Sequence, residues 1–288
     1  MRRALGIIGT AFAILLLWRV LSPARPDRWA VPSAALGQTR HVLVHPPASG
    51  GAGSGGHPLL VLLDGGDQRQ HSAERTLYAR SVAVLTAMQR DGVPPTLLVG
   101  VENRNRIRDF TPIQRPDLYV GGGGALAFIR FLETELVPFV ETRWPVGSRR
   151  ILYGESYGGL LVLDALARGS GVFTDYIAVS PAVGAWPDGL AVVLRQRMAT
   201  RSVAAPGAEA AGALRNVFVV YGERDAPLVT EFTPPVVRLL EAGRPTTWRI
   251  GVEVLPRAGH NPPESLARGL QFVFGAQASE DTLIPQPQ

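Results

Sequence analysis

The chain contains no cysteine and no lysine. Without cysteine it can form no disulfide, thiolate metal site or cysteine nucleophile, and it offers no cysteine for a lipid anchor. All 29 basic residues are therefore arginines, scattered among 24 acidic residues to give a formal net charge of +5. Neither a zinc-type Cys/His spacing nor a nucleic-acid-binding motif accompanies this positive charge, so we expect no nucleic acid partner.

One apolar run begins the chain. Met1-Arg2-Arg3 precedes apolar residues from Ala4 to Trp18, a combination typical of a signal peptide or a short signal anchor, which we assign to residues 1–21. The two arginines are expected to stay in the cytoplasm. The rest would then be exported, either periplasmic or secreted, with residues 4–21 as a candidate anchor in the inner membrane.

The other residues alternate apolar runs of strand length with segments of helical periodicity. This alternation is typical of a mostly parallel sheet with helices on both faces. We expect one α/β domain over residues 37–275, after a linker at 22–36 and before a flexible tail at 276–288. The expected strands are 40–45, 59–63, 96–101, a run from 151, 176–180, 216–221 and 248–255, and the expected helices are 77–88, 125–142, 160–167, 190–198, 233–240 and 263–274.

The sequence Gly-Glu-Ser-Tyr-Gly at 154–158 joins an apolar run to a helical segment. The order strand, G-x-S-x-G, helix is the nucleophile elbow of α/β-hydrolases, in which a strained turn exposes a serine, here Ser156. Gly154 and Gly158 are expected there because a Cβ at either would strike the adjoining strand or helix. The turn also places the Tyr157 amide at a helix N-terminus, where it can hold an oxyanion. The sequence thus predicts an α/β-hydrolase fold, preceded by an N-terminal hydrophobic helix.

A serine nucleophile needs a general base, and only one of the five histidines, His260, follows Ser156. The triad of α/β-hydrolases runs in the order serine, acid, histidine, so His260 is the predicted base. The acid is expected after the strand at 216–221, where it would fix the histidine tautomer. Asp225 is favoured, and Glu223 is the alternative acid.

The second oxyanion donor is expected at the end of an early strand. Gly65-Gly66 ends such a strand and permits close backbone approach, so we choose Gly66, with Asp67 as its alternative. The alternative interpretation is that Gly65 and Gly66 only form a tight turn.

The long loop at 102–124 carries three arginines, Arg104, Arg106 and Arg108. They are candidates to bind an anionic or catecholate substrate. For Arg108 the alternative is a structural pair with Asp109 that braces the loop, and we favour the structural interpretation slightly.

Several segments together are similar to one known family. They are Leu62–Gly66, Val99–Arg106, Arg108–Pro112, Phe131–Phe139, Gly154–Leu160, Tyr176–Pro181, Gly259–His260 and Gly269–Phe272. In this order they resemble the esterase D-like family of α/β-hydrolases, nearest the branch of bacterial periplasmic ferric-siderophore esterases. The resemblance covers roughly Leu59 to Phe274.

This resemblance implies a serine carboxylic-ester hydrolase that acts through an acyl-enzyme on a small-molecule ester, siderophore-like or other. It implies no metal and no organic cofactor. From the N-terminal sequence itself we expect membrane contact only through that segment. Because the family includes mycolyltransferases, a serine acyltransferase is the alternative function, and a non-catalytic tethered binding module is a third. Relatives often carry a bulky aromatic pair after the Ser-Pro turn, whereas this chain has the single Trp186, a candidate substrate-binding residue.

Overall fold

A computed structural model describes residues 27–47, 55–66, 76–203 and 214–275 of the 288-residue chain. The strands are β1 Asp27–Val31, β2 Arg40–His45, β3 His57–Gly66, β4 Leu97–Glu102, β5 Val146–Glu155, β6 Asp175–Val179, β7 Arg215–Gly222 and β8 Trp248–Leu255. The helices include α2 Leu77–Arg90, α3 Arg106–Phe110, α4 Ala125–Phe131, α5 Val137–Glu141, α6 Tyr157–Arg168, α7 Pro187–Val203, α8 Pro227–Thr230, α9 Thr233–Gly243 and α10 Ser265–Phe274. None of the helices in these ranges has the length and apolarity that crossing a lipid bilayer requires. The predicted signal segment, its hydrophobic helix and the predicted tail lie outside the described residues.

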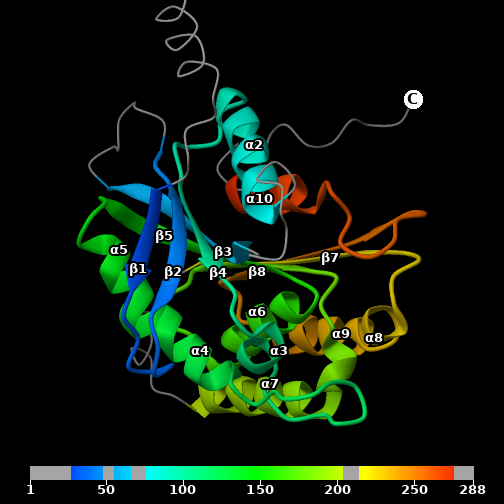
Figure 1. Cartoon of the computed structure of the whole chain (residues 1–288). Coiled ribbons are helices and arrows are strands. Elements are labelled where there is room, and N and C mark those ends of the chain that lie inside the picture. Colours follow the sequence, from blue (N-terminus) through cyan, green and yellow to red (C-terminus); the bar gives the residue numbers. More distant parts are fainter. Residues whose placement is uncertain (1–26, 48–54, 67–75, 204–213, 276–288) are drawn as a thin grey trace, which may run out of the picture.

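The strands form one eight-stranded sheet in the order β1-β2-β4-β3-β5-β6-β7-β8. The pairs β1–β2 and β2–β4 are antiparallel, and all pairs from β4 to β8 are parallel. Figure 1 shows α2 and α10 on one side of the sheet and α4, α6, α7 and α9 on the other. The predicted α/β-hydrolase fold, mostly parallel and covered on both faces, is confirmed. Because parallel strands end at one edge, the carboxyl ends of β3, β5, β6 and β7 lie together.

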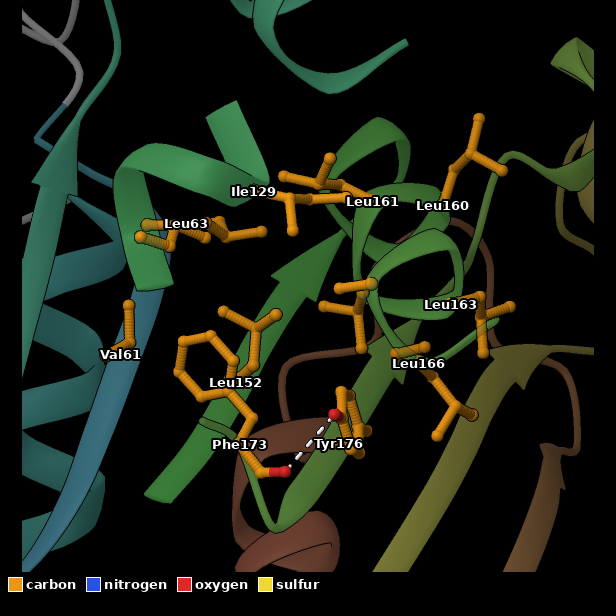
Figure 2. Packing of buried hydrophobic residues seen from close by; sticks show 14 of the residues in the cluster. Val61, Leu63, Ile129, Leu152, Leu160, Leu161, Leu163, Leu166, Phe173 and Tyr176 are labelled. Atoms are coloured by element: carbon orange, nitrogen blue, oxygen red, sulfur yellow. Dashed lines mark hydrogen bonds between the residues drawn. The ribbon is translucent and has the colours of Figure 1, made fainter. Parts of the chain in front are cut away.

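The larger of two hydrophobic clusters lies between the sheet and α6 (Figure 2). Val61 of β3, Leu152 of β5 and Tyr176 of β6 all belong to this cluster, on the side of the sheet that α6 covers. Every α6 residue from Gly158 to Ala167 is buried, so the helix that follows Ser156 is packed along nearly its whole length. Burial of each leucine there contributes about 1.5–3 kcal/mol. The start of α6, and with it Ser156, is therefore fixed by packing far from the turn itself.

The helix expected at 125–142 is present but is not uniform. A π-helical segment, Leu132–Leu136, separates α4 from α5. Pro138 lies just beyond it, at the start of α5. Proline lacks an N–H and its ring collides with the carbonyl four residues earlier, so a wider turn before Pro138 relieves the conflict.

The predicted linker at 22–36 is structured from Asp27 onward. Residues 27–31 form the edge strand β1, whose Trp29 packs edge-on against Trp144 at 5.6 Å between ring centroids. The amides of Ala34 and Ala35 then both donate to Glu135 Oε1 at 2.9 Å. The sequence does not predict this strand, since it lies in a proline-rich stretch. Because β1 is mostly exposed, its residues also show no alternation of buried and exposed positions.

A fully buried ion pair joins β2 to the start of the long loop. Arg40 Nη2 donates to Asp109 Oδ2, and the two side chains are 0% and 1% exposed. Burial lowers the pKa of the Arg40 guanidinium, and the nearby Asp109 carboxylate opposes that shift. Arg108 also pairs with Asp109 at 2.7 Å, which is the bracing contact that the sequence favoured for it.

We expect Asp109→Asn to destabilise the protein by about 3–5 kcal/mol, because it leaves the Arg40 charge buried without a counter-charge. Urea unfolding followed by circular dichroism measures this loss. Glu253→Gln, which breaks the half-exposed pair with Arg268, is the matched control and should cost at most about 1 kcal/mol. Equal losses in the two variants would contradict the assignment.

Candidate active site

Ser156 lies in the tight turn between β5 and α6. Its φ of 58° and ψ of −116° are strained for a residue with a side chain. The Ser156 amide donates to the Val179 carbonyl at 2.9 Å, and the Ala182 amide donates to the Ser156 carbonyl at 3.0 Å. These bonds tie the turn to the end of β6, so the strain is maintained by the neighbouring strand.

The glycines of the elbow differ in whether the structure leaves room for a Cβ. A Cβ on Gly154 would lie 2.5 Å from the backbone of Gly158, as expected. A Cβ on Gly158 itself would have its nearest neighbour at 3.6 Å, an ordinary contact, so the steric prediction was wrong at this position. The crowded helix position is the next one, Gly159, where a Cβ would lie 2.8 Å from the Val179 carbonyl oxygen.

His260 meets Asp225 in the loop region beyond β7 and β8. The imidazole Nδ1 lies 2.6 Å from Asp225 Oδ1, which also accepts from the Ala226 amide at 2.7 Å. Because a carboxylate only accepts hydrogen bonds, Nδ1 carries the proton and Nε2 of a neutral ring is left with its lone pair. The Asp225 side chain is fully buried, whereas that of His260 is 41% exposed, so the carboxylate orients a ring that solvent and substrate can reach.

Two consecutive residues at the end of β6, Val179 and Ser180, hold both halves of the site. Val179 accepts from the Ser156 amide, and the Ser180 hydroxyl accepts from the amide of Asn261 at 2.9 Å. Ser156 and the His260–Asn261 step are therefore bound to adjacent residues of one strand end. Ser180, a buried residue with a φ of 41°, is a site residue that the sequence analysis did not single out.

Glu223, the alternative acid, has a different partner. Its Oε2 accepts from the Arg257 amide at 2.8 Å and closes the turn after β8. Arg257 has a positive φ of 60°, so this bond stabilises a strained turn. The structure thus brings Asp225 to His260 and leaves Glu223 in a structural contact.

The predicted oxyanion donors lie at the ends of neighbouring strands. Tyr157 is the first residue of α6, and Gly66 is the last residue of β3, which pairs with β5. A Cβ on Gly66 would collide with the Glu102 side chain, so glycine is required there by close packing. Asp67, the alternative donor, lies outside the described residues.

The three loop arginines have separate environments. Arg106 Nε donates a hydrogen bond to Asp64 Oδ2 of β3 at 2.7 Å. Arg108 braces Asp109, and Arg104 is exposed. The ring of Trp186 lies 5.7 Å from the guanidinium of Arg168, at the far end of α6 from Ser156.

Glu155, between Gly154 and Ser156, carries a largely buried carboxyl group. It accepts a hydrogen bond from the Tyr153 hydroxyl at 2.7 Å. Burial raises the pKa of the Glu155 carboxyl, while the Tyr153 bond and the charge of Arg80 act in the opposite direction. In the parts of the chain that the structure describes, no group of three or more acidic or histidine side chains is placed to hold a metal ion.

Glu155→Gln should make the protein more stable at neutral pH but not at acid pH. A raised folded-state pKa means that this carboxyl favours folding below the ordinary value of 4.5, and that the benefit is lost as pH rises through the raised pKa. Glutamine keeps the acceptor for Tyr153 and cannot ionise. Thermal melts between pH 4 and pH 8 measure the difference, for which about 1 kcal/mol corresponds to about 2–4 °C in Tm.

The exposed Glu231→Gln is the control and should show no such dependence on pH. A Glu155→Gln effect that is the same at every pH would show that the Glu155 carboxyl does not ionise with a raised pKa.

The strained serine turn and the covered parallel sheet together define an α/β-hydrolase. A family model described as "Putative esterase" matches residues 33–246, and the chain belongs to this family. The expected resemblance is thereby confirmed at the level of the family.

Individual relatives agree with this membership. The chain is 30% identical over 163 residues to the ferri-bacillibactin esterase BesA of Bacillus subtilis, a match that covers 51% of this chain and 54% of the relative. It is 32% identical over 151 residues to the apo-salmochelin esterase of Escherichia coli, covering 48% of this chain and 46% of that protein. The chain thus spans about half the length of the curated relatives it matches.

Among solved structures, the siderophore hydrolase EstA of Aspergillus nidulans superimposes with a TM-score of 0.72. The alignment covers 89% of this chain and 97% of EstA at 20% identity. At this identity the likeness supports the fold alone.

Proposed function

We propose that this protein is a serine carboxylic-ester hydrolase with Ser156 as nucleophile, His260 as general base and Asp225 as the orienting acid. The observation that carries the proposal is the 2.6 Å contact between His260 Nδ1 and the buried Asp225 carboxylate, in a loop bound to the same strand end as Ser156. A histidine fixed in this tautomer is the base that a serine nucleophile requires.

The reaction proceeds in two acyl-transfer steps. His260 Nε2 takes the Ser156 hydroxyl proton while Oγ attacks the ester carbonyl, and the Tyr157 and Gly66 amides hold the oxyanion. The proton then passes from His260 to the leaving alcohol, and the acyl group remains on Ser156. Water, deprotonated by the same imidazole, attacks the acyl-enzyme, and the carboxylic acid leaves as the proton returns to Ser156 Oγ.

The substrate class proposed is a small ester of the siderophore type. The support comes from the relatives, which include enzymes named for ferri-bacillibactin, salmochelin and triacetylfusarinine C. The basic, apolar N-terminal sequence supports an exported enzyme, periplasmic or secreted, with residues 4–21 as the candidate anchor in the inner membrane. Arg104, exposed near the strand ends, remains the candidate for an anionic part of the substrate.

The acyltransferase alternative makes the same acyl-enzyme and differs only in the acceptor. Product analysis with an added alcohol separates the two, since a transferase forms the new ester in preference to the free acid. A binding module would form no acyl-enzyme at all.

Wild-type protein should react with a fluorophosphonate probe and hydrolyse p-nitrophenyl butyrate and a ferric trilactone siderophore. Ser156→Ala removes the nucleophile and should abolish labelling and lower kcat by about 10⁶-fold. In-gel fluorescence and chromatography of the siderophore products measure these results. Absence of labelling on the wild type, or equal labelling of Ser156→Ala, would favour the binding module.

The acid is tested by comparing two isosteric variants. Asp225→Asn should lower kcat by about 10³- to 10⁴-fold, because an asparagine amide no longer fixes the required histidine tautomer. Glu223→Gln keeps an acceptor for the Arg257 amide and should leave kcat within about threefold of wild type, with a small change in Tm. The reverse order of effects would assign the acid to Glu223.

A further inference from the structure

Arg106 connects the ends of two neighbouring strands beside Ser156. Its Nε donates to Asp64 Oδ2 at 2.7 Å, and its Nη2 donates to the Glu155 carbonyl oxygen at 2.8 Å. Asp64 lies in β3, and Glu155 ends β5 directly before Ser156. One guanidinium thus binds a side chain of one strand and the main chain of the other.

One residue that Arg106 contacts, and one that directly follows the other contact, have a strained backbone. Asp64 and Ser156 each have a φ of 58°, a left-handed conformation that residues with a Cβ rarely adopt. Such residues persist only where the surroundings over-determine their conformation. Asp64 is held through both carboxylate oxygens, since Asn103 Nδ2 donates to Oδ1 at 2.5 Å.

The guanidinium also reaches the residue that supplies the proposed oxyanion amide. It lies 5.4 Å from the ring centroid of Tyr157 and 5.9 Å from that of Phe110. Tyr119 of the long loop packs edge-on against the Tyr157 ring, with 5.8 Å between the ring centroids. Gly65-Gly66, the other proposed oxyanion segment, follows Asp64 without a gap in the chain.

We infer that Arg106 is a positioning residue that holds the two halves of the oxyanion site, Gly66 at the end of β3 and Tyr157 after β5, in their relative positions. The inference rests on the proposed function. A planar guanidinium is suited to this task because its donors point in fixed, different directions, whereas a lysine ammonium has no such fork. The Nε and Nη2 donors are used within the protein, so binding of substrate charge is not the main role of this side chain.

The test compares Arg106→Lys and Asp64→Asn with wild type on a neutral ester, p-nitrophenyl butyrate, and an anionic one, p-nitrophenyl hemisuccinate. Displacement of the oxyanion amides should lower kcat about 10²-fold on both esters, with KM changed less than threefold. The rate of phosphonylation by the fluorophosphonate should fall by a similar factor. In Arg106→Gly, millimolar methylguanidinium should restore part of kcat.

Arg268→Ala is the matched control, because it removes an arginine–carboxylate pair between α10 and β8 and should leave kcat unchanged. A loss confined to KM for the anionic ester would overturn the inference in favour of substrate binding by Arg106. Unchanged kcat in the folded Asp64→Asn or Arg106→Lys protein would overturn it as well.

Failure of the proposed function has a different result. It would leave the wild type itself unlabelled and inactive on both esters, whereas failure of the inference alone leaves an active wild type and equally active variants. Tm measurements separate loss of folding from loss of rate. If Arg106→Lys unfolds, Asp64→Asn, which keeps the shape of the side chain, decides the matter.

Discussion

The hydrogen bond from the Ser156 amide to the Val179 carbonyl is the constraint on which the rest of the site depends. It fixes the strained turn against the end of β6 and starts α6 at a defined point. The same strand end continues into Ser180, whose hydroxyl holds the loop of His260. One short backbone segment therefore positions both Ser156 and His260, which lie 104 residues apart in the chain.

Around this segment the protein concentrates backbone strain and offsets it with packing. Asp64, Ser156, Ser180 and Arg257 all have positive φ, and each lies in a loop or strand end near the carboxyl edge of the sheet. Each of these turns is tied by a side-chain or main-chain hydrogen bond to another strand end. Below them, the fully buried α6 and the strands under it provide a rigid base, so thermal motion is poorly able to release the strain.

The polar contacts of the site divide into two roles. Asp225 and Asp64 each lie beside a basic side chain, yet Asp225 orients an exposed imidazole while Asp64 holds a guanidinium against the main chain. Glu223, the alternative acid in the sequence, has a structural partner, and Arg108 makes the bracing pair with Asp109 that the sequence favoured. The position of an acidic residue in the sequence therefore does not by itself identify the catalytic acid, because the tertiary structure determines which side chains are in contact.

The sequence by itself determined the fold class and the position of the elbow, because apolar runs, helical periodicity and G-x-S-x-G are local patterns whose meaning depends on chain neighbours. It also ordered Ser156, Asp225 and His260 along the chain, since the order of connected strands in this fold is constrained. It could not show the edge strand β1 or the contacts of Arg106 with Asp64 and Glu155. Those features arise between residues far apart in sequence, and only tertiary packing decides which side chain meets which partner.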